Sequence, residues 1–232
     1  MNNNSRRGAQ LPAYIAATHF PQALTMVVLM TFATALCGAS WSSVVFVFLA
    51  SAAGQATVGW TNDVHDAEVD RAAGRAKKPT VRGDLRPEQL RVPLMVSASL
   101  TIPLSFLAAG WVGGGAHIVA VMSALSYNFW LSRTVWSWLP YAVSFALMTV
   151  FIAQASSPVL WPSVPVLVLS VLVGVTAHLF NAVPDIESDR RTGLGGLTVF
   201  LGRRRALALA FVLMALIAAC AAVVITEFVV SR

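Results

Sequence analysis

The chain has 232 residues, of which 57% are hydrophobic and 11% are charged. A soluble domain usually carries about 25% charged residues, so this composition excludes an ordinary soluble protein. The formal net charge is +6, but the basic residues are not clustered with aromatic residues, and we expect no nucleic-acid partner. The two cysteines, Cys37 and Cys220, indicate neither a disulfide framework nor a metal site.

Apolar segments recur along the chain at the length that a helix needs to cross a hydrocarbon core about 30 Å thick. We place them at residues 15–37, 42–60, 92–112, 116–131, 136–155, 163–182 and 206–230. Backbone polar groups need internal partners in lipid, so these segments are predicted helices. Short outer connections are expected at 37–41, 113–117 and 156–162. The sequence therefore predicts an all-α membrane protein, a single domain over residues 1–232 with about seven transmembrane helices.

The distribution of basic residues predicts the orientation in the membrane. If successive helices alternate in direction, fifteen of the sixteen Lys and Arg residues fall on one side, and only Arg232 falls on the other. The positive-inside rule assigns the first side to the cytoplasm. We therefore expect a multi-pass protein of the plasma membrane, with a cytoplasmic N-terminus and with both long polar segments, 61–91 and 184–205, in the cytoplasm.

Those two polar segments repeat one motif. The first reads Asn62-x3-Asp66-x3-Asp70-Arg71-x2-Gly74, and the second reads Asn181-x3-Asp185-x3-Asp189-Arg190-x2-Gly193, at a constant offset of 119 residues. Positions i, i+4 and i+8 share one face of a helix, and Pro184 is expected to kink the second helix. Four predicted helices separate the motifs, so both point to the same side of the membrane, unlike the inverted repeats of transporters.

Grouped aspartates at a membrane edge repel one another and resist desolvation. One such motif would be typical of a solvated helix end, but two with the same spacing favour a shared cation. Carboxylate oxygens suit Mg²⁺, which keeps several waters and completes its shell with phosphate oxygens. The intervening basic residues would donate to a diphosphate: Arg75, Lys77, Lys78 and Arg82. An apolar helical cavity beside a diphosphate site suits an allylic prenyl diphosphate.

The segments 62–71 and 181–193, with Leu201-Gly202 after them, resemble the two aspartate-rich motifs of the UbiA-type intramembrane prenyltransferases. The resemblance implies Mg²⁺-dependent ionisation of a prenyl diphosphate and alkylation of a lipophilic, usually aromatic, acceptor within the membrane. It implies a catalytic, metal-binding role for Asp66, Asp70, Asp185 and Asp189, with Asp63 as a further candidate ligand. It implies diphosphate binding by Asn62, Arg75, Lys78, Tyr127, Arg133 and Asn181. Arg133 would replace a basic residue that the family has where this chain has Leu131.

Family members usually have nine helices, so this fold would lack the last two. One wall of the cavity would then face lipid or be closed by a second copy in a homo-oligomer. His178 and Gln55 share helical faces with the motifs and are weaker candidates for the acceptor pocket, and His19 is a weaker candidate for the cavity mouth. Prenyl transfer is the leading hypothesis. A terpene cyclase acting without an acceptor is the alternative, and a transporter or lipid-binding scaffold is a third.

Overall fold

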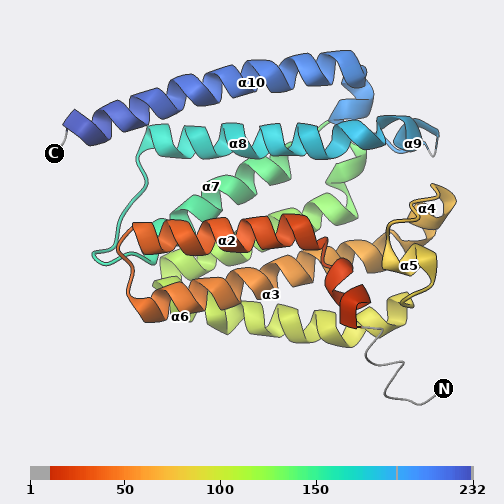
Figure 1. Cartoon of the computed structure of the whole chain (residues 1–232), viewed down its shortest axis with the longest axis horizontal. Helices are drawn as coiled ribbons and strands as arrows, with labels where there is room; N and C mark the ends of the chain where they lie inside the picture. The colour runs from red at the N-terminus through yellow and green to blue at the C-terminus, as the bar shows by residue number, and fades with distance from the viewer. Residues whose placement is uncertain (1–10, 192, 231–232) are drawn as a thin grey trace.

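The computed structural model describes residues 11–191 and 193–230, and the regular structure within them is helical. The long helices lie side by side along the longest axis of the molecule (Figure 1). The short helices α4, α5 and α9 lie together at one end, opposite the connections from α2 to α3 and from α7 to α8. The two polar segments therefore lie at the same end, as predicted. Arg6, Arg7 and Arg232, which contribute to the predicted topology, fall outside the described residues.

The long helices have the following bounds: α2 (Phe20–Leu36), α3 (Trp41–His65), α6 (Pro87–Phe129), α7 (Leu139–Gln154), α8 (Val164–Ala182) and α10 (Leu197–Val230). The short ones are α4 (Ala67–Ala72), α5 (Pro79–Arg82), η1 (Leu131–Arg133), η2 (Val183–Asp185) and α9 (Ile186–Arg191). Among the described residues, four segments are long and apolar enough to cross a membrane: 41–65, 87–129, 164–191 and 197–226. Helices α2 and α7 are apolar but shorter, with 17 and 16 residues. The all-α membrane fold is confirmed, and the number of crossings and the location of the N-terminus stay predictions.

Helix α6 doubles back on itself at Ala109 and Gly110, which have non-helical backbone angles. The φ of Gly110 is +63°, a left-handed conformation that glycine adopts without a steric penalty. Ser105 Oγ lies 2.7 Å from His117 Nδ1, so the two halves pack against each other after the turn. Helix α6 thus corresponds to two of the predicted helices.

The predicted connection at 113–117 is wrong, because these residues are helical and the turn comes earlier. The glycines that suggested a loop permit close packing instead. A Cβ at Gly114 would lie 2.7 Å from Phe106 Cδ1, and one at Gly113 would lie 2.7 Å from Gln154 Cβ. Small residues let helix backbones approach closely in membranes.

The apolar core lies between α2, α3, α6 and α7, where Met30, Val47, Met148 and Phe151 are buried. Helix α10 packs along α8 at the edge of the bundle, on the side away from α2 (Figure 1). It exposes large apolar side chains along its length: Phe211, Val212, Met214, Leu216, Val223 and Ile225. Lipid, or a second copy of the chain, stays the predicted cover of these side chains.

Candidate active site

Each aspartate motif lies where a long helix gives way to a short one. Helix α3 ends at His65, Asp66 caps its C-terminus, and Asp70 lies on α4. In the second motif α8 ends at Ala182, and Pro184 falls in the 3-10 turn η2. The expected kink at Pro184 is therefore present, as a tightened turn. Helical i→i−4 bonds from Asp66 N to Asn62 O and from Asp70 N to Asp66 O continue through the first motif, and the single helix face of each motif stays a prediction.

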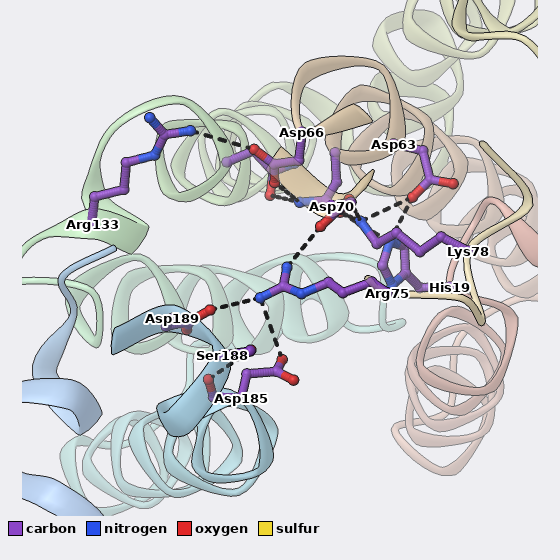
Figure 2. A network of polar contacts seen from close by, with 12 residues as sticks. His19, Asp63, Asp66, Asp70, Arg75, Lys78, Arg133, Asp185, Ser188 and Asp189 are labelled. Atoms are coloured by element: carbon purple, nitrogen blue, oxygen red, sulfur yellow. Dashed lines mark hydrogen bonds and ion pairs between the residues drawn. The ribbon is translucent and has the colours of Figure 1, made fainter. Parts of the chain in front are cut away.

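The two motifs meet across the guanidinium of Arg75 (Figure 2). Arg75 Nη1 donates to Asp70 Oδ1 at 2.8 Å, and Nη2 donates to Asp189 Oδ1 at 2.7 Å. Asp185 Oδ2 lies 4.0 Å from the same Nη2. One cationic group from the first polar segment thus contacts carboxylates of both motifs, so the repeat in the sequence forms one site in space.

Lys78 contacts the buried side chains of the first motif. Its Nζ lies 2.6 Å from Asp70 Oδ2 and 3.1 Å from Asp63 Oδ1, and it donates to Asn62 Oδ1 at 2.6 Å. The side chains of Asp63 and Asp70 are 1% and 0% exposed. Carboxylates are almost never buried to this extent unless they are paired. Lys78 is therefore paired with the buried carboxylates of the first motif, and its role in diphosphate binding stays a prediction.

Asn62 connects the first motif to its surroundings. Its Nδ2 donates to Asp66 Oδ2 at 2.9 Å and contacts Asn128 Oδ1 at 3.4 Å, while His19 Nε2 lies 3.1 Å from its Oδ1. His19 also lies 3.4 Å from Asp63 Oδ1. The amide of Asn62 is thereby held from α2, α3 and α6 at once, which fixes its position at the site.

Arg133 reaches the first motif from η1. Its Nη2 lies 3.6 Å from Asp66 Oδ1, and its side chain is 43% exposed. Arg133 therefore lies beside the first motif despite its shifted position, and its role in diphosphate binding stays a prediction. The distance makes this a loose, solvent-screened pair.

The charges at the site perturb one another. Burial raises the pKa of Asp66, and the neighbouring Asp70 carboxylate raises it further, while Lys78 lowers it. For Arg75, burial acts to lower the pKa, but the carboxylates of Asp185 and Asp70 prevail and raise it. Burial and the Asp70 carboxylate therefore both disfavour the charged form of Asp66, and the neighbouring cations favour it.

The remaining predicted residues lie deeper or to the side. Asn181 is exposed, and its Nδ2 lies 3.4 Å from the hydroxyl of Tyr141. The ring of Tyr127 packs edge-on against Tyr141 and against His178. Within the described residues, therefore, Asn181 and Tyr127 contact this aromatic cluster and not the Arg75 network. Gln55 is half-buried on α3, and its predicted role stays a prediction.

Among the described residues, no group of three or more His, Cys, Asp or Glu side chains converges on a point that could hold a metal. Arg75 and Lys78 stand between the carboxylates instead. Mg²⁺ is usually held by one or two carboxylates together with waters and substrate phosphates. The donors present, four aspartates from two motifs and the buried Asp63, whose Oδ2 has no hydrogen-bond partner, fit this ion.

Two residues outside the motifs, Asn128 and His19, also contact the site. Asn128, buried on α6, contacts Asn62 and donates to the carbonyl of Val58 at 3.0 Å. Its signal in the sequence is an amide within an apolar helix, next to Tyr127. His19, a weaker candidate in the sequence, contacts Asn62 and Asp63 from a left-handed backbone conformation.

A cavity of about 460 Å³ lies at the other end of the bundle, lined by residues including Ser40, Trp111 and Gln154.

Comparisons with known proteins identify the family and the fold. A family model described as the UbiA prenyltransferase family matches residues 13–230, while a search of curated proteins finds no match. The fold is similar to that of a UbiA homologue from Archaeoglobus fulgidus bound to DMAPP and Mg²⁺, with a TM-score of 0.78 and 20% identity over 93% of this chain and 78% of that one. The same protein bound to GPP and Mg²⁺ gives the same values.

An apo UbiA homologue from Aeropyrum pernix K1 is also similar, with a TM-score of 0.67 and 16% identity over 86% of this chain and 77% of that one. At these identities the solved structures establish the fold. The family model extends over both aspartate motifs and nearly all of the described helices. The chain belongs to the UbiA prenyltransferase family.

Proposed function

We propose that this protein ionises an allylic prenyl diphosphate with the help of Mg²⁺ and transfers the prenyl group to a lipophilic, aromatic acceptor within the membrane. The observation that carries the proposal is the contact of Arg75 with Asp70 and Asp189, which brings both motifs to one cationic group. A site with carboxylates on both sides and cations between them suits a metal-bound polyanion. Solved structures of similar fold hold DMAPP or GPP with Mg²⁺.

In this proposal Asp66, Asp70, Asp185 and Asp189 hold the metal. When bound, Mg²⁺ neutralises the diphosphate and stabilises the charge that develops as the diphosphate leaves. Arg75 and Lys78 donate hydrogen bonds to the oxygens of the diphosphate. These hydrogen bonds are strong because both partners are charged. Asn62 orients the first motif through its hydrogen bond to Asp66, and Arg133 and Asn181 lie at the edge, where they can contact the exposed part of the diphosphate.

The apolar part of the substrate lies on the bundle side of the motifs. The ring of Tyr127 packs edge-on against that of Tyr141, whose hydroxyl lies 3.4 Å from Asn181 Nδ2 of the second motif. A ring face attracts a cation electrostatically. The prenyl cation formed by loss of the diphosphate would be stabilised there until it is attacked. His178 and Gln55 belong to the proposed acceptor pocket on the same side.

Diphosphate release and product analysis test the proposal. The purified chain in lipid nanodiscs, with Mg²⁺ and geranyl diphosphate, should release diphosphate faster when a phenolic acceptor is added, and mass spectrometry should detect the prenylated phenol. Cyclic hydrocarbon formed without an acceptor would show a terpene cyclase instead. No Mg²⁺-dependent release under either condition, with an Asp66→Asn variant as the background, would contradict both enzymatic functions.

A further inference from the structure

A buried polar cluster lies within the aromatic region, deeper in the membrane than the aspartates. His178 on α8 is 1% exposed and contacts the rings of Tyr127 and Tyr141, with centroids 5.9 Å and 5.1 Å away. Its Nε2 lies 3.0 Å from the hydroxyl of Ser137, which is also 1% exposed. His178 precedes Asp185 by seven residues, which places it about 10 Å deeper at 1.5 Å per residue.

We propose that Ser137 fixes the tautomer of His178, so that its Nδ1–H donates a hydrogen bond to an oxygen of the acceptor substrate. The inference rests on the proposed function and names two positioning residues for it. Ser137 would set the direction of the hydrogen bond, and His178 would make it.

The tautomer follows from a count of donors and acceptors. The backbone N–H of Leu197 donates to Ser137 Oγ at 3.0 Å, so this oxygen already accepts one hydrogen bond. A serine hydroxyl has a single proton to donate. Among the described residues, the hydrogen-bond contacts of this hydroxyl are Leu197 N–H and His178 Nε2. If Nε2 accepts that proton, the hydroxyl is satisfied and the imidazole proton resides on Nδ1.

The opposite tautomer is less favourable. With the proton on Nε2, Ser137 would accept twice and its own buried proton would have no acceptor, while Nδ1 would be a second unsatisfied group. Each buried polar group left without a partner costs about 1–3 kcal/mol. The Nδ1–H tautomer leaves only one.

That one remaining group points to a ligand. Nδ1 of His178 is buried and has no hydrogen-bond partner in the described part of the chain. Buried polar groups are paired in the great majority of cases, and an exception calls for an explanation such as a bound molecule. A prenyl tail is a hydrocarbon and cannot accept a hydrogen bond, and the diphosphate is held near Asp185. An acceptor substrate with a hydroxyl or carbonyl oxygen supplies the missing partner.

The second polar segment holds Ser137 in place. The segment after the second motif passes so close to η1 that a Cβ at Gly195 would lie 2.2 Å from the Arg133 carbonyl oxygen. Only glycine fits this approach, which brings the Leu197 N–H to Ser137. The direction of the His178 hydrogen bond is thereby coupled to the chain that carries the diphosphate ligands.

Nitrogen NMR of the full chain with ¹⁵N-labelled histidine tests the tautomer directly, and the His178→Gln variant assigns the signal among the four histidines. We expect a protonated Nδ1 and an unprotonated Nε2 in the native protein and in Ser137→Thr, which keeps the hydroxyl. Ser137→Ala should lose this preference. A native His178 with its proton on Nε2 would overturn the proposal.

Binding of the substrate oxygen is tested with phenol and its methyl analogue toluene as probes, in the presence of Mg²⁺ and geranyl diphosphate. Phenol should shift the Nδ1 signal, and toluene should not. Equal shifts with both, or no shift with phenol, would contradict the hydrogen bond. This readout requires no turnover, so it remains informative if the proposed reaction fails in the release assay.

Kinetics separate positioning from folding. His178→Asn keeps an N–H donor near the position of Nδ1, whereas His178→Gln moves the donor toward Nε2 and His178→Phe removes it. For phenol prenylation we expect the KM for phenol to rise roughly tenfold in the Gln and Phe variants and to recover in the Asn variant. The KM for geranyl diphosphate should be unchanged in all three. An Asn variant as impaired as the Phe variant, at equal yield of inserted protein, would overturn the role of Nδ1.

Discussion

Asp70 and Asp189 stand at equivalent positions of the two motifs, 119 residues apart, and both accept hydrogen bonds from one guanidinium, that of Arg75. The repeat in the sequence is therefore a pair of half-sites that a single cation joins. In the proposed function, the carboxylates that pair with Arg75 would bind the metal, and Arg75 would donate to the diphosphate.

Each motif contributes aspartates that the proposed reaction requires. Asp66→Asn and Asp185→Asn should each lower the rate of diphosphate release more than about 100-fold, since even outer-shell partners of a metal contribute 10–100-fold. The amide keeps the shape of the side chain and removes its charge, so insertion should be unaffected. Asp84→Asn is the control, because Asp84 pairs only with exposed Arg82 in the described contacts. Near-normal turnover of either motif variant at saturating Mg²⁺ would refute the two-motif site.

In the absence of substrate, Arg75 is the cation that joins Asp70 and Asp189. Arg75→Gln should leave Asp70 and Asp189 without their shared cation and lower the free energy of unfolding by about 1–3 kcal/mol, less than for a fully buried pair because Arg75 is partly exposed. Mg²⁺ should then raise the Tm of the variant more than that of the native protein, since the ion restores the missing charge. Arg82→Gln, at an exposed pair, should change stability by less than about 1 kcal/mol. Equal Mg²⁺ responses of Arg75→Gln and the native chain would contradict this.

Charge patterning and the even number of helices between the motifs are sufficient to predict that both motifs lie at one end of the bundle. Pro184 predicts the bend at Val183–Asp185, but periodicity could not predict the bend at Asp66, since it depends on how the chain packs beyond the helix end. Nor could it pair Asn62 with Asn128 or Ser137 with His178. Such contacts join separate helices, and sequence spacing describes only the faces within one helix.

The sidedness of the site stays a prediction that chemical labelling can test. Ala76 is exposed between α4 and α5, at the end with the motifs, and Val159 is exposed in the connection from α7 to α8 at the opposite end. After replacement of Cys37 and Cys220 by alanine, Ala76→Cys should react with an impermeant maleimide only in inverted vesicles. Val159→Cys should react only in intact cells. The reverse pattern would place the aspartates outside the cytoplasm.

Two neighbouring glycines play different roles in α6. Gly114 and Gly115 are neighbours, but a Cβ at Gly114 would lie 2.8 Å from Phe106 Cα and 2.9 Å from its backbone nitrogen, whereas one at Gly115 would meet nothing within 4 Å. Gly114→Ala must therefore push the two halves of α6 apart and should destabilise the protein by about 1–3 kcal/mol. Gly115→Ala should be neutral or stabilising by up to about 1 kcal/mol, because alanine favours the helix. Unfolding midpoints in mixed detergent measure both. Equal effects of the two substitutions would contradict the close packing of the two halves of α6 at Gly114.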